Sequence, residues 1–538
     1  MSEQKISRRT FISATAMAGL AMALDWGKIN ALAATIRTKK DLPVVVIGAG
    51  IGGLCCAALL AKRGFPVTVV EQHDIPGGYA TTFDRAGGKF TFEVSLHRMS
   101  ANIELRHLLK ELGILDKIEF VKIPNTMRVI TPDQDFRDTG NLKQKINGLI
   151  EKFPHEKKGI ERYLAEMQAV MNELKLLITK GGGRNMASRY PKLWKIKDQT
   201  VAAFMDEYIR EPGIKESLAS GLIGTFGLPP SKLSAFMYIL ARASGENEQY
   251  YIKRRSQNLS DALAESIEEY GGQIIYETMI EKIVQKDGAV SGVVTSEGKQ
   301  LPAKIVISNA NAMTTLNNML PSETPPPDYL HRINSYGTSL STFVIWLGLN
   351  REIHASIKDS HMVISSGRGV EASYRSCLSG DVDKVDPSVT IYDNYYKGYS
   401  KPGTSTVTII TGCGFQPWQR FESDYKAGRK ADYNKEKERW TRILMKKVEE
   451  KAIPGLSSMV EVMEAATPLT NWRYTLNPGG AIYGFHFSVD NSFMNRIKNR
   501  TPIKGLYLAS AWGNAGGGYA PGLKGGERTF ELVLEDLA

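Results

Sequence analysis

The sequence predicts an α/β protein organised around a parallel sheet that binds a dinucleotide. Three observations in residues 43–78 support this prediction. A β-branched run at 44–47 is typical of a strand buried on both faces of a sheet. A glycine-rich turn and a helix of small apolar residues follow this run, and a second strand at 65–70 then leads to the acidic residue Glu71. These parts stand in the order of a Rossmann-type βαβ unit, with about 20 residues between glycines and acid.

The turn at 48–53 reads Gly-Ala-Gly-Ile-Gly-Gly, a GxGxxG motif. In such a motif Gly48 allows the tight turn, Gly50 lets the backbone approach a pyrophosphate, and Gly53 lets the helix pack on the strand. The N–H groups at the start of the helix then point at the phosphates. The Glu71 carboxylate can bind two ribose hydroxyls, which disfavours a 2′-phosphate. The alternative is a glycine-rich turn in some other α/β protein.

Composition excludes several classes of protein. The 538 residues suffice for two or three domains, and the net charge is +11. Lys and Arg are dispersed and no nucleic-acid-binding motif occurs, so no nucleic-acid partner is expected. Two interpretations of the positive charge remain: a basic face that meets an anionic membrane or an acidic substrate, or charged side chains that are simply solvated. The four cysteines form no CxxC and the eight histidines show no metalloprotease spacing, so no metal site is predicted.

Residues 1–34 are predicted to be a twin-arginine export signal. Arg8 and Arg9 precede Thr-Phe-Ile, the apolar stretch at 11–24 is too short to span a bilayer, and Ala-Leu-Ala at 31–33 forms a cleavage site. The alternative is an uncleaved amphipathic or disordered tail. Export predicts a periplasmic or cell-envelope location and contact with the twin-arginine machinery. Because NADH and NADPH are scarce there, electrons would pass through a quinone, a redox-protein partner or the substrate itself.

The middle of the chain predicts a helical region and then a mixed one. Apolar residues between 163 and 178 keep a 3.6-residue period, and helices are expected through about 140–245. This region is either a helical cap with its own core or a Met-rich, aromatic wall around an apolar substrate, with a peripheral contact to the membrane. Farther on, strands are expected at 274–276, 280–284, 290–295, 342–349 and 406–411, and a helix at 433–451. The strands at 274–276 and 280–284 are expected to form a pair.

Three segments resemble the phytoene desaturase, carotenoid isomerase and retinol saturase family of FAD enzymes, within the amine oxidase superfamily. They are the βαβ unit with Gly77-Gly78 after the acid, the strand-and-loop segment 87–97, and the glycine-rich carboxyl-terminal stretch 505–526. Five departures occur. Tyr79 replaces an Arg, and Ala515 replaces a Pro. In the segment 87–97 Glu93 replaces an Asp and Ser95 a Gly, while His97 is kept. Lys-Arg-Arg-Ser-Gln at 253–257 stands where the family carries Pro-x-Gly-Gly.

The resemblance implies an α/β fold with a discontinuous FAD-binding Rossmann-type domain of the GR2-like kind and an α+β substrate domain with a helical cap. The implied segments are FAD-binding parts at 40–135, 246–311 and 505–538, a helical cap at 136–245 and a substrate domain at 312–504. The implied FAD-binding residues are Gly48, Gly50, Gly52, Gly53, Glu71, Gln72, Gly77, Gly78, Ile280, Asn309, Gly513, Gly518 and Gly522. Ile280 would pack by its backbone on the adenine, and the carboxyl-terminal helix would face the flavin pyrimidine edge.

The implied activity is hydride transfer between flavin N5 and a conjugated, apolar, isoprenoid or polyene-like substrate, as desaturase, saturase or isomerase. In the saturation direction Tyr519 and His97 are the candidate proton donors, and for His97 a hydrogen-bonded core histidine is the alternative. Two other functions stay open: a flavin amine oxidase, with Tyr519 in an aromatic cage and Lys524 near N5, and a non-catalytic exported flavoprotein.

Overall fold

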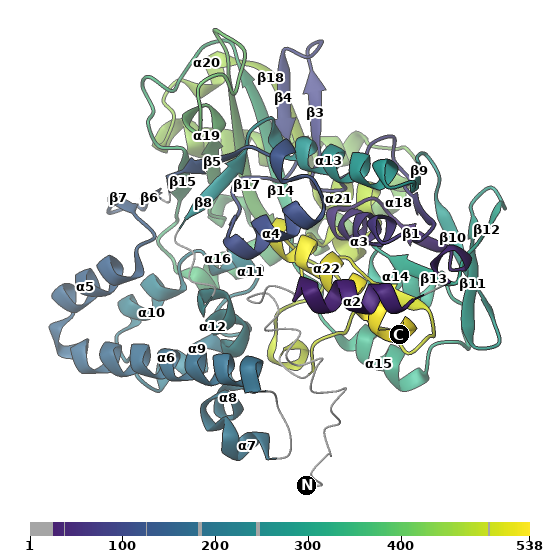
Figure 1. Ribbon diagram of the computed structural model, residues 1–538. Coiled ribbons are helices and arrows are strands. Elements are labelled where there is room, and N and C mark those ends of the chain that lie inside the picture. The colour runs from purple at the N-terminus through teal and green to yellow at the C-terminus, as the bar shows by residue number, and fades with distance from the viewer. Residues whose placement is uncertain (1–24, 37, 125, 181–184, 244–247, 493–494) are drawn as a thin grey trace.

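The computed structural model describes residues 25–36, 38–124, 126–180, 185–243, 248–492 and 495–538. Figure 1 shows a parallel-sheet region on the right, a large sheet with helices at the top and a helical region at the lower left. The predicted α/β class with separate nucleotide and substrate regions is confirmed. The twin-arginine motif lies outside the described residues.

The first sheet has five parallel strands in the order β19-β13-β1-β2-β9. They are β1 (Val44–Ile47), β2 (Val67–Val70), β9 (Gln273–Ile275), β13 (Ile305–Ser308) and β19 (Leu506–Leu508). The chain leaves β1 toward β2 on one side, and β13 lies on the other side. The strand order therefore reverses beside β1, and ligands of open α/β sheets bind at the carboxyl edge next to such a reversal.

The alternating side chains of β1 explain its β-branched composition. Val44 and Val46 pack into one core, while Val45 and Ile47 pack into the core on the opposite face. The first core also holds α3 (Ile51–Lys62), α13 (Arg255–Glu269), α4 (Ile103–Glu111) and α22 (Tyr519–Leu537). The second core holds residues of α14 (Ala312–Asn317) and α15 (Pro327–Ser335). A strand buried on both faces has no polar side, as the run 44–47 predicted.

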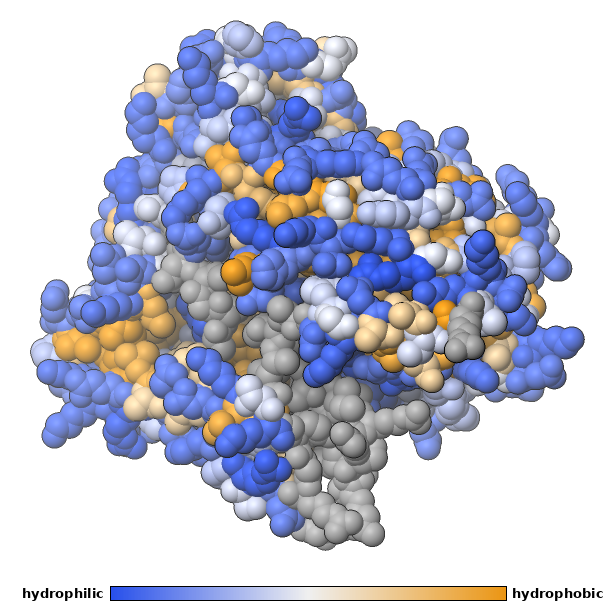
Figure 2. All heavy atoms as spheres, in the orientation of Figure 1, coloured by the Kyte–Doolittle hydropathy of each residue, from blue (hydrophilic) through white to orange (hydrophobic). Residues whose placement is uncertain are grey.

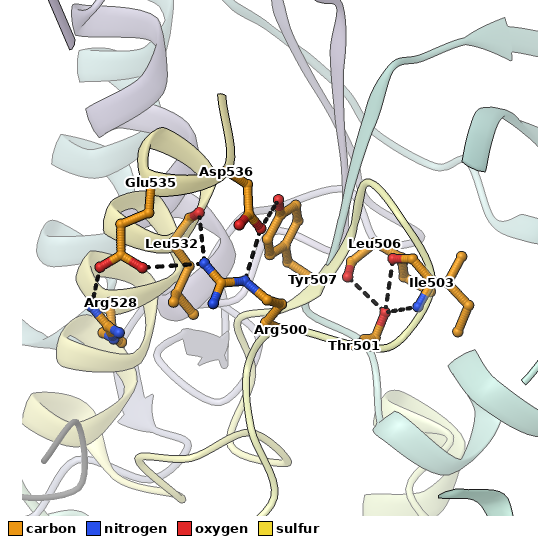
Figure 3. A network of polar contacts seen from close by, with 9 residues as sticks. All are labelled: Arg500, Thr501, Ile503, Leu506, Tyr507, Arg528, Leu532, Glu535 and Asp536. Atoms are coloured by element: carbon orange, nitrogen blue, oxygen red, sulfur yellow. Dashed lines mark hydrogen bonds and ion pairs between the residues drawn. The ribbon is translucent and has the colours of Figure 1, made fainter. Parts of the chain in front are cut away.

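The carboxyl-terminal helix α22 is tied to the sheet by a polar network (Figure 3). Arg500 Nε donates to Asp536 at 2.8 Å and its guanidinium also pairs with Glu535 at 3.1 Å. The Tyr507 hydroxyl on β19 donates to the same Asp536 at 2.8 Å. The last turn of α22 is thereby fixed to the edge strand of the sheet, which sets where the first turn of the helix lies.

A small antiparallel sheet corrects one prediction. It consists of β10 (Ile280–Lys286), β11 (Ala289–Thr295) and β12 (Gln300–Pro302). The strands at 274–276 and 280–284 were expected to pair, but β9 instead pairs in parallel with β2, and β10 pairs with β11. Apolar periodicity identifies a strand without identifying its partner, so the pairing prediction was wrong.

The substrate region is built on a seven-stranded sheet in the order β18-β14-β17-β16-β15-β6-β7. Its strands are β6 (Met127–Ile130), β7 (Asp135–Asp138), β14 (Ser341–Leu349), β15 (His361–Ile364), β16 (Ser388–Ile391), β17 (Ser405–Cys413) and β18 (Val460–Ala466). Helices α16 (Val370–Ser379), α17 (Gln416–Gln419), α18 (Glu422–Lys426), α19 (Ala431–Lys451), α20 (Leu456–Met459) and α21 (Pro468–Thr475) accompany it. Because β6 pairs with β15, the segment 127–138 belongs to this sheet and not to the first FAD-binding segment, which the sequence ended at 135.

The helical region contains α5 (Leu142–Lys152), α6 (Lys157–Lys180), α7 (Met186–Arg189), α8 (Pro191–Ile196), α9 (Val201–Asp206), α10 (Pro212–Ala219), α11 (Leu222–Phe226) and α12 (Ala235–Ala243). Met167, Met205 and Met237 are buried in a core shared with the substrate sheet. These methionines therefore act mainly as core residues. Figure 2 shows hydrophobic residues on the outer surface between α5, α10 and α6, at the left of this face.

The remaining strands form one hairpin and one antiparallel pair between segments distant in the chain, and one more helix precedes β1. β3 (Thr82–Arg85) pairs with β4 (Phe90–Glu93), and β5 (Phe120–Ile123) pairs with β8 (Gln249–Ile252). Helix α2 (Trp26–Thr35) contains the predicted cleavage site, and its Ile29 and Ala33 are buried against the core that includes α22. The ring of Trp26 stacks on Phe530 with centroids 6.4 Å apart.

Candidate FAD site

The GxGxxG turn lies at the carboxyl end of β1, beside the strand reversal. A Cβ at Gly52 would come 2.0 Å from the carbonyl oxygen of Ala509, which follows β19. A Cβ at Gly50 would come 2.4 Å from the side-chain amide nitrogen of Asn309, which follows β13. At Gly52 only glycine lets the two backbones approach so closely, and at Gly50 the Asn309 side chain occupies the space that a Cβ would need.

Asn309 ties the turn to the second strand of the crevice. Its side-chain oxygen accepts the Gly53 N–H at 2.9 Å, and its own N–H donates to the Ile47 carbonyl at 2.8 Å. The side chain thus satisfies one of the free N–H groups at the start of α3. The structure brings Asn309, 256 residues away in the chain, into the predicted nucleotide-binding turn.

Glu71 lies directly under the turn and is buried. One carboxylate oxygen accepts the Ala49 N–H at 2.6 Å and the other accepts the His73 N–H at 3.0 Å. Its carbonyl accepts the N–H of Thr278 at 2.9 Å, so the segment leading into β10 and Ile280 crosses beside the acid. Gln72 points elsewhere, since its side-chain nitrogen donates to the carbonyl of Tyr474 at 3.1 Å.

The Gly-Gly pair after the acid packs on the same turn. The Gly77 N–H donates to the Ala49 carbonyl at 2.7 Å, and Gly77 bridges to Gly50. Gly78 packs beside Gly50 with ordinary spacing, since a Cβ on it would lie 3.5 Å from the Gly50 Cα, and its φ of 61° is what favours glycine there. Tyr79 follows, where the resemblance expects an Arg. Its hydroxyl is buried beside Thr475 and, among the described residues, has no partner in hydrogen-bonding geometry.

The carboxyl-terminal glycine turn meets the first one at the helix crossing of α3 and α22. A Cβ on Gly526 would come 2.3 Å from the Gly52 carbonyl oxygen, and the Cys55 thiol donates to the Leu523 carbonyl at 3.3 Å. Gly522 faces Ile51, the first residue of α3. The two glycine-rich segments, more than 400 positions apart, therefore form one site (Figure 1).

Two buried side chains that the sequence analysis missed hold the loop before α22. The Arg496 guanidinium donates to the carbonyls of Gly513 and Asn514 at 3.1 and 3.0 Å. Asn499 accepts the Asn514 N–H at 2.7 Å and donates to the Gly525 carbonyl at 3.1 Å. Burial lowers the pKa of Arg496 to about 10. No sequence motif marks these residues, because their partners are backbone groups.

Tyr519 is the first residue of α22, next to Gly518. Its hydroxyl lies 3.1 Å from the hydroxyl of Ser95, and Ser95 donates to the Tyr79 carbonyl at 2.7 Å. Burial raises the pKa of the Tyr519 phenol, and the Glu93 carboxylate adds to that rise. The segment 87–97 and the start of α22 are thus in contact, as the resemblance implies for two segments beside a flavin ring.

His97 has protein partners on its ring. Nδ1 lies 2.9 Å from the Tyr392 hydroxyl and 3.3 Å from the Thr390 hydroxyl, and the two rings of His97 and Tyr392 are stacked. Burial lowers the pKa of His97 to about 4, so the ring is neutral at pH 7. These contacts favour the hydrogen-bonded core histidine over the proton donor.

Glu93 occupies the most unusual environment near the site. It is 1% exposed and accepts hydrogen bonds from Ser256 and Tyr251. Burial raises the pKa of this carboxyl to about 7, while the hydrogen bonds and the nearby Arg255 oppose the rise. In the sequence Glu93 stands out only as a substitution for an Asp, and no motif assigns it a role.

The residues present fit FAD. The glycine turn at the start of α3 offers backbone N–H groups to the pyrophosphate, and Glu71 lies where the adenine ribose would follow. Among the described residues, the buried hydroxyl of Tyr79 lies beside the Thr475 side chain and makes no hydrogen bond of good geometry, which leaves it available to a bound nucleotide. Gly48 to Gly53, Glu71 and Gly78 would hold the nucleotide, and the start of α22 would face the ring. Among the described residues, no three His, Cys, Asp or Glu side chains cluster as metal ligands.

The fold and the site define a flavin-dependent oxidoreductase. Residues 51–522 match the family described as flavin containing amine oxidoreductase. Because this match spans most of the chain, the protein belongs to that family, and its cofactor is FAD. The predicted cofactor, enzyme class and superfamily are confirmed.

Two curated relatives are similar along most of their length. The chain is 27% identical over 508 residues to an all-trans-retinol 13,14-reductase of Danio rerio, covering 88% of this chain and 82% of that protein. It is also 27% identical over 495 residues to prolycopene isomerase 2 of an Oncidium hybrid cultivar, covering 88% and 81%.

Solved structures share the fold at low identity. An oxidoreductase from Methanosarcina mazei is 16% identical with a TM-score of 0.60, covering 92% of this chain and all of that one. A putrescine oxidase variant is 13% identical with a TM-score of 0.61, covering 92% and 99%. A cyclohexylamine oxidase from Brevibacterium oxydans is 15% identical with a TM-score of 0.59, covering 92% and 99%. At these identities the likeness shows the fold alone.

Proposed function

We propose that this flavoenzyme transfers a hydride between flavin N5 and a conjugated, apolar substrate of isoprenoid or polyene type. The observation that carries the proposal is the similarity, over 88% of the chain, to relatives named for retinol and prolycopene, which are both polyenes. Bound FAD would supply the hydride acceptor or donor. Tyr519, beside the glycine turn at 513–518, would exchange a proton with the substrate.

The contacts of Lys524 speak against an amine oxidase. In that reading this lysine would lie free near flavin N5. Instead it is buried in α22 and its ammonium pairs with Glu527 at 2.8 Å. The Tyr519 hydroxyl is likewise engaged with Ser95. The contacts of Lys524 and Tyr519 therefore do not support an aromatic cage that is open to an amine.

We also propose export by the twin-arginine route to the periplasm or cell envelope, with a quinone or redox-protein electron partner and a peripheral membrane contact. The hydrophobic surface between α5, α10 and α6 supports such a contact (Figure 2). Across the described part of the chain, no helix has the length and apolar character needed to cross a membrane. Cleavage at 31–33 would require α2 to leave its packed position on Phe530. Amino-terminal sequencing of the exported protein tests this: a start after Ala33 supports cleavage, and an intact amino terminus contradicts it.

The substrate proposal is tested with the purified flavin-loaded protein. Its flavin is photoreduced without oxygen and mixed with all-trans-retinol, a carotenoid or a quinone. Reoxidation by a polyene, with a chemically changed polyene as product, supports the proposal. Hydrogen peroxide release with amines, and no reaction with any polyene, would favour an amine oxidase and contradict it.

A further inference from the structure

The buried carboxyl of Glu93 is part of a series of neighbouring hydroxyl groups, called the hydroxyl series below, that runs from Tyr519 through Ser256 and Glu93 to Tyr251 and Tyr399. The Ser256 N–H donates to one carboxylate oxygen at 2.8 Å, and the Ser256 hydroxyl donates to the other at 2.5 Å. The Tyr251 hydroxyl donates to the carboxylate as well. Another buried acid, Glu156, shows a different arrangement, because its oxygen accepts the backbone N–H groups of Arg210 and Glu211. Glu93 is therefore surrounded by groups that can pass a proton.

The end of the hydroxyl series nearest the candidate FAD site is Tyr519. Its hydroxyl lies 3.1 Å from the Ser95 hydroxyl and 3.4 Å from the Tyr79 carbonyl. Burial raises the pKa of its phenol, the Glu93 charge adds to the rise, and the nearby Ser95 and Ser256 hydroxyls oppose it. Ser256 is thus next to both the Tyr519 phenol and the Glu93 carboxyl. The Ser256 hydroxyl donates to Glu93 and to the Thr81 carbonyl in this structure, and a rotation about its side-chain bond, without movement of the backbone, would let it hand a proton to the phenol.

The other end of the hydroxyl series, Tyr399, lines a cavity. The Tyr251 hydroxyl, whose proton is donated to Glu93, lies 3.4 Å from the Tyr399 hydroxyl, which can donate to it in turn. Tyr399 and Arg255 both line a cavity of about 90 Å³, together with Lys89 and Lys401. A cavity of this size has room for several water molecules, and its lysines and hydroxyls can hold them. Glu93 is therefore joined through Tyr251 to Tyr399, a buried residue that also lines this cavity.

Arg255 lies beside Tyr399 and has an unusual backbone conformation. It and Arg254 have φ angles of 72° and 67°, in the left-handed region that favours glycine. The resemblance expects two glycines at this point of the chain. The Arg255 side chain lies over the Tyr399 ring, 4.3 Å from its centroid, and donates to the Tyr399 carbonyl at 2.9 Å. The strained backbone thus holds a cation against the outermost tyrosine.

We propose that Glu93 is a proton-relay residue that connects Tyr519 to solvent through Ser256 on one side and Tyr251 and Tyr399 on the other. This inference rests on the proposed function, in which Tyr519 exchanges a proton with the substrate. Glu93 does not touch the substrate, so it acts through Tyr519.

The proton balance is simple in the saturation direction. Tyr519 gives its proton to the substrate and becomes a phenolate. Ser256 then gives its proton to Tyr519 and takes one from the Glu93 carboxyl, so one O–H bond breaks and one forms at each step. Water in the cavity returns a proton to Glu93 through Tyr399 and Tyr251. One proton enters per turnover, and in the oxidation direction each step runs in reverse.

The first test measures the flavin-loaded enzyme with the polyene that reoxidises it. In Glu93→Gln and Ser256→Ala, kcat should fall by on the order of 10²-fold with little change in KM, because the proton step slows. The solvent deuterium isotope effect on kcat should rise in Tyr399→Phe. The control is Tyr433→Phe, a buried tyrosine bonded to Thr467 and Thr470, and it should match the wild type. Variants with the kcat and isotope effect of the control would overturn the relay.

The second test needs neither flavin nor substrate. The infrared carboxylic-acid band of Glu93, assigned by its loss in Glu93→Gln, is followed after transfer of the apoprotein into D₂O. Fast deuteration in the wild type and slower deuteration in Tyr399→Phe support the relay, and equal rates in both overturn it. If flavin binds but no polyene reacts, the proposed function fails while this second test still decides the relay.

Discussion

The nucleotide end of the candidate FAD site is built from backbone, whereas the ring end is built from buried side chains. At the nucleotide end the contacts run between Gly52, Ala509 and the N–H groups that meet Glu71. At the ring end Glu93, Ser256 and a group of tyrosines face one another. The backbone contacts at the nucleotide end suit any dinucleotide, whereas the carboxyl and hydroxyl groups at the ring end can supply protons to a reaction at the flavin. Binding and chemistry therefore depend on different parts of the chain, and they can be disturbed separately.

The largest effect is expected from Gly52→Ala at the nucleotide end. A Cβ would collide with the Ala509 carbonyl oxygen at 2.0 Å, so α3 must move from β19. We expect the free energy of unfolding to fall by about 3 kcal/mol and bound flavin to be lost. Denaturant unfolding and the flavin-to-protein ratio measure both. Gly148→Ala in α5 is the control: its Cβ would meet nothing within 4 Å, and it should stabilise the protein by about 0.5–1 kcal/mol. A stable, yellow Gly52→Ala would disprove the close-approach argument.

At the ring end, the raised pKa of Glu93 should make the free energy of unfolding depend on pH. The pKa of Glu93 rises on folding from 4.5 to about 7, so the folded state binds more protons than the unfolded state between these values. Stability from Glu93 is therefore present at low pH and lost as pH rises through 7, by about 3 kcal/mol.

His97 acts in the opposite direction. Its pKa falls on folding from 6.5 to about 4, so its contribution is lost as pH drops through that range. Glu93→Gln removes only the first effect. Relative to the wild type, the variant should gain about 3 kcal/mol between pH 4 and pH 8, measured by denaturant unfolding. A constant difference across this range would contradict the raised pKa.

A smaller effect is expected from Glu71→Gln. The carboxylate accepts two backbone N–H groups, and an amide nitrogen would face one of these donors instead. Loss of one charged hydrogen bond costs about 1.5–3 kcal/mol, so the Kd for FAD should rise roughly tenfold to hundredfold. FAD titration of the apoprotein measures it. Glu156→Gln, which changes a buried acid far from the turn, should leave this Kd unchanged. Equal affinities in both variants would remove Glu71 from the nucleotide site.

The smallest effect is expected from Arg254→Gly at the ring end. Glycine adopts the observed φ of 67° without strain, so this variant should be more stable by about 1 kcal/mol. Arg255→Gly relieves the same kind of strain but loses the contact with Tyr399, and it should gain less. Thermal unfolding of both variants measures the difference. If Arg255→Gly is the more stable of the two, the Tyr399 contact contributes nothing to the fold.

The sequence by itself determined the parallel sheet, the glycine turn, Glu71 and the flavin class, because these depend on short segments whose order and spacing fix their geometry. It also identified the two glycine-rich segments that meet at the α3–α22 crossing. It did not determine the partner of β9, the membership of β6 in the substrate sheet, or the roles of Arg496 and Asn499. Glu93, Tyr251, Ser256 and Tyr399 were decided only by the tertiary structure. Their hydroxyl and carboxyl groups come from β4, β8, α13 and the loop before β17, and burial gives them their chemistry only when these parts of the chain pack together.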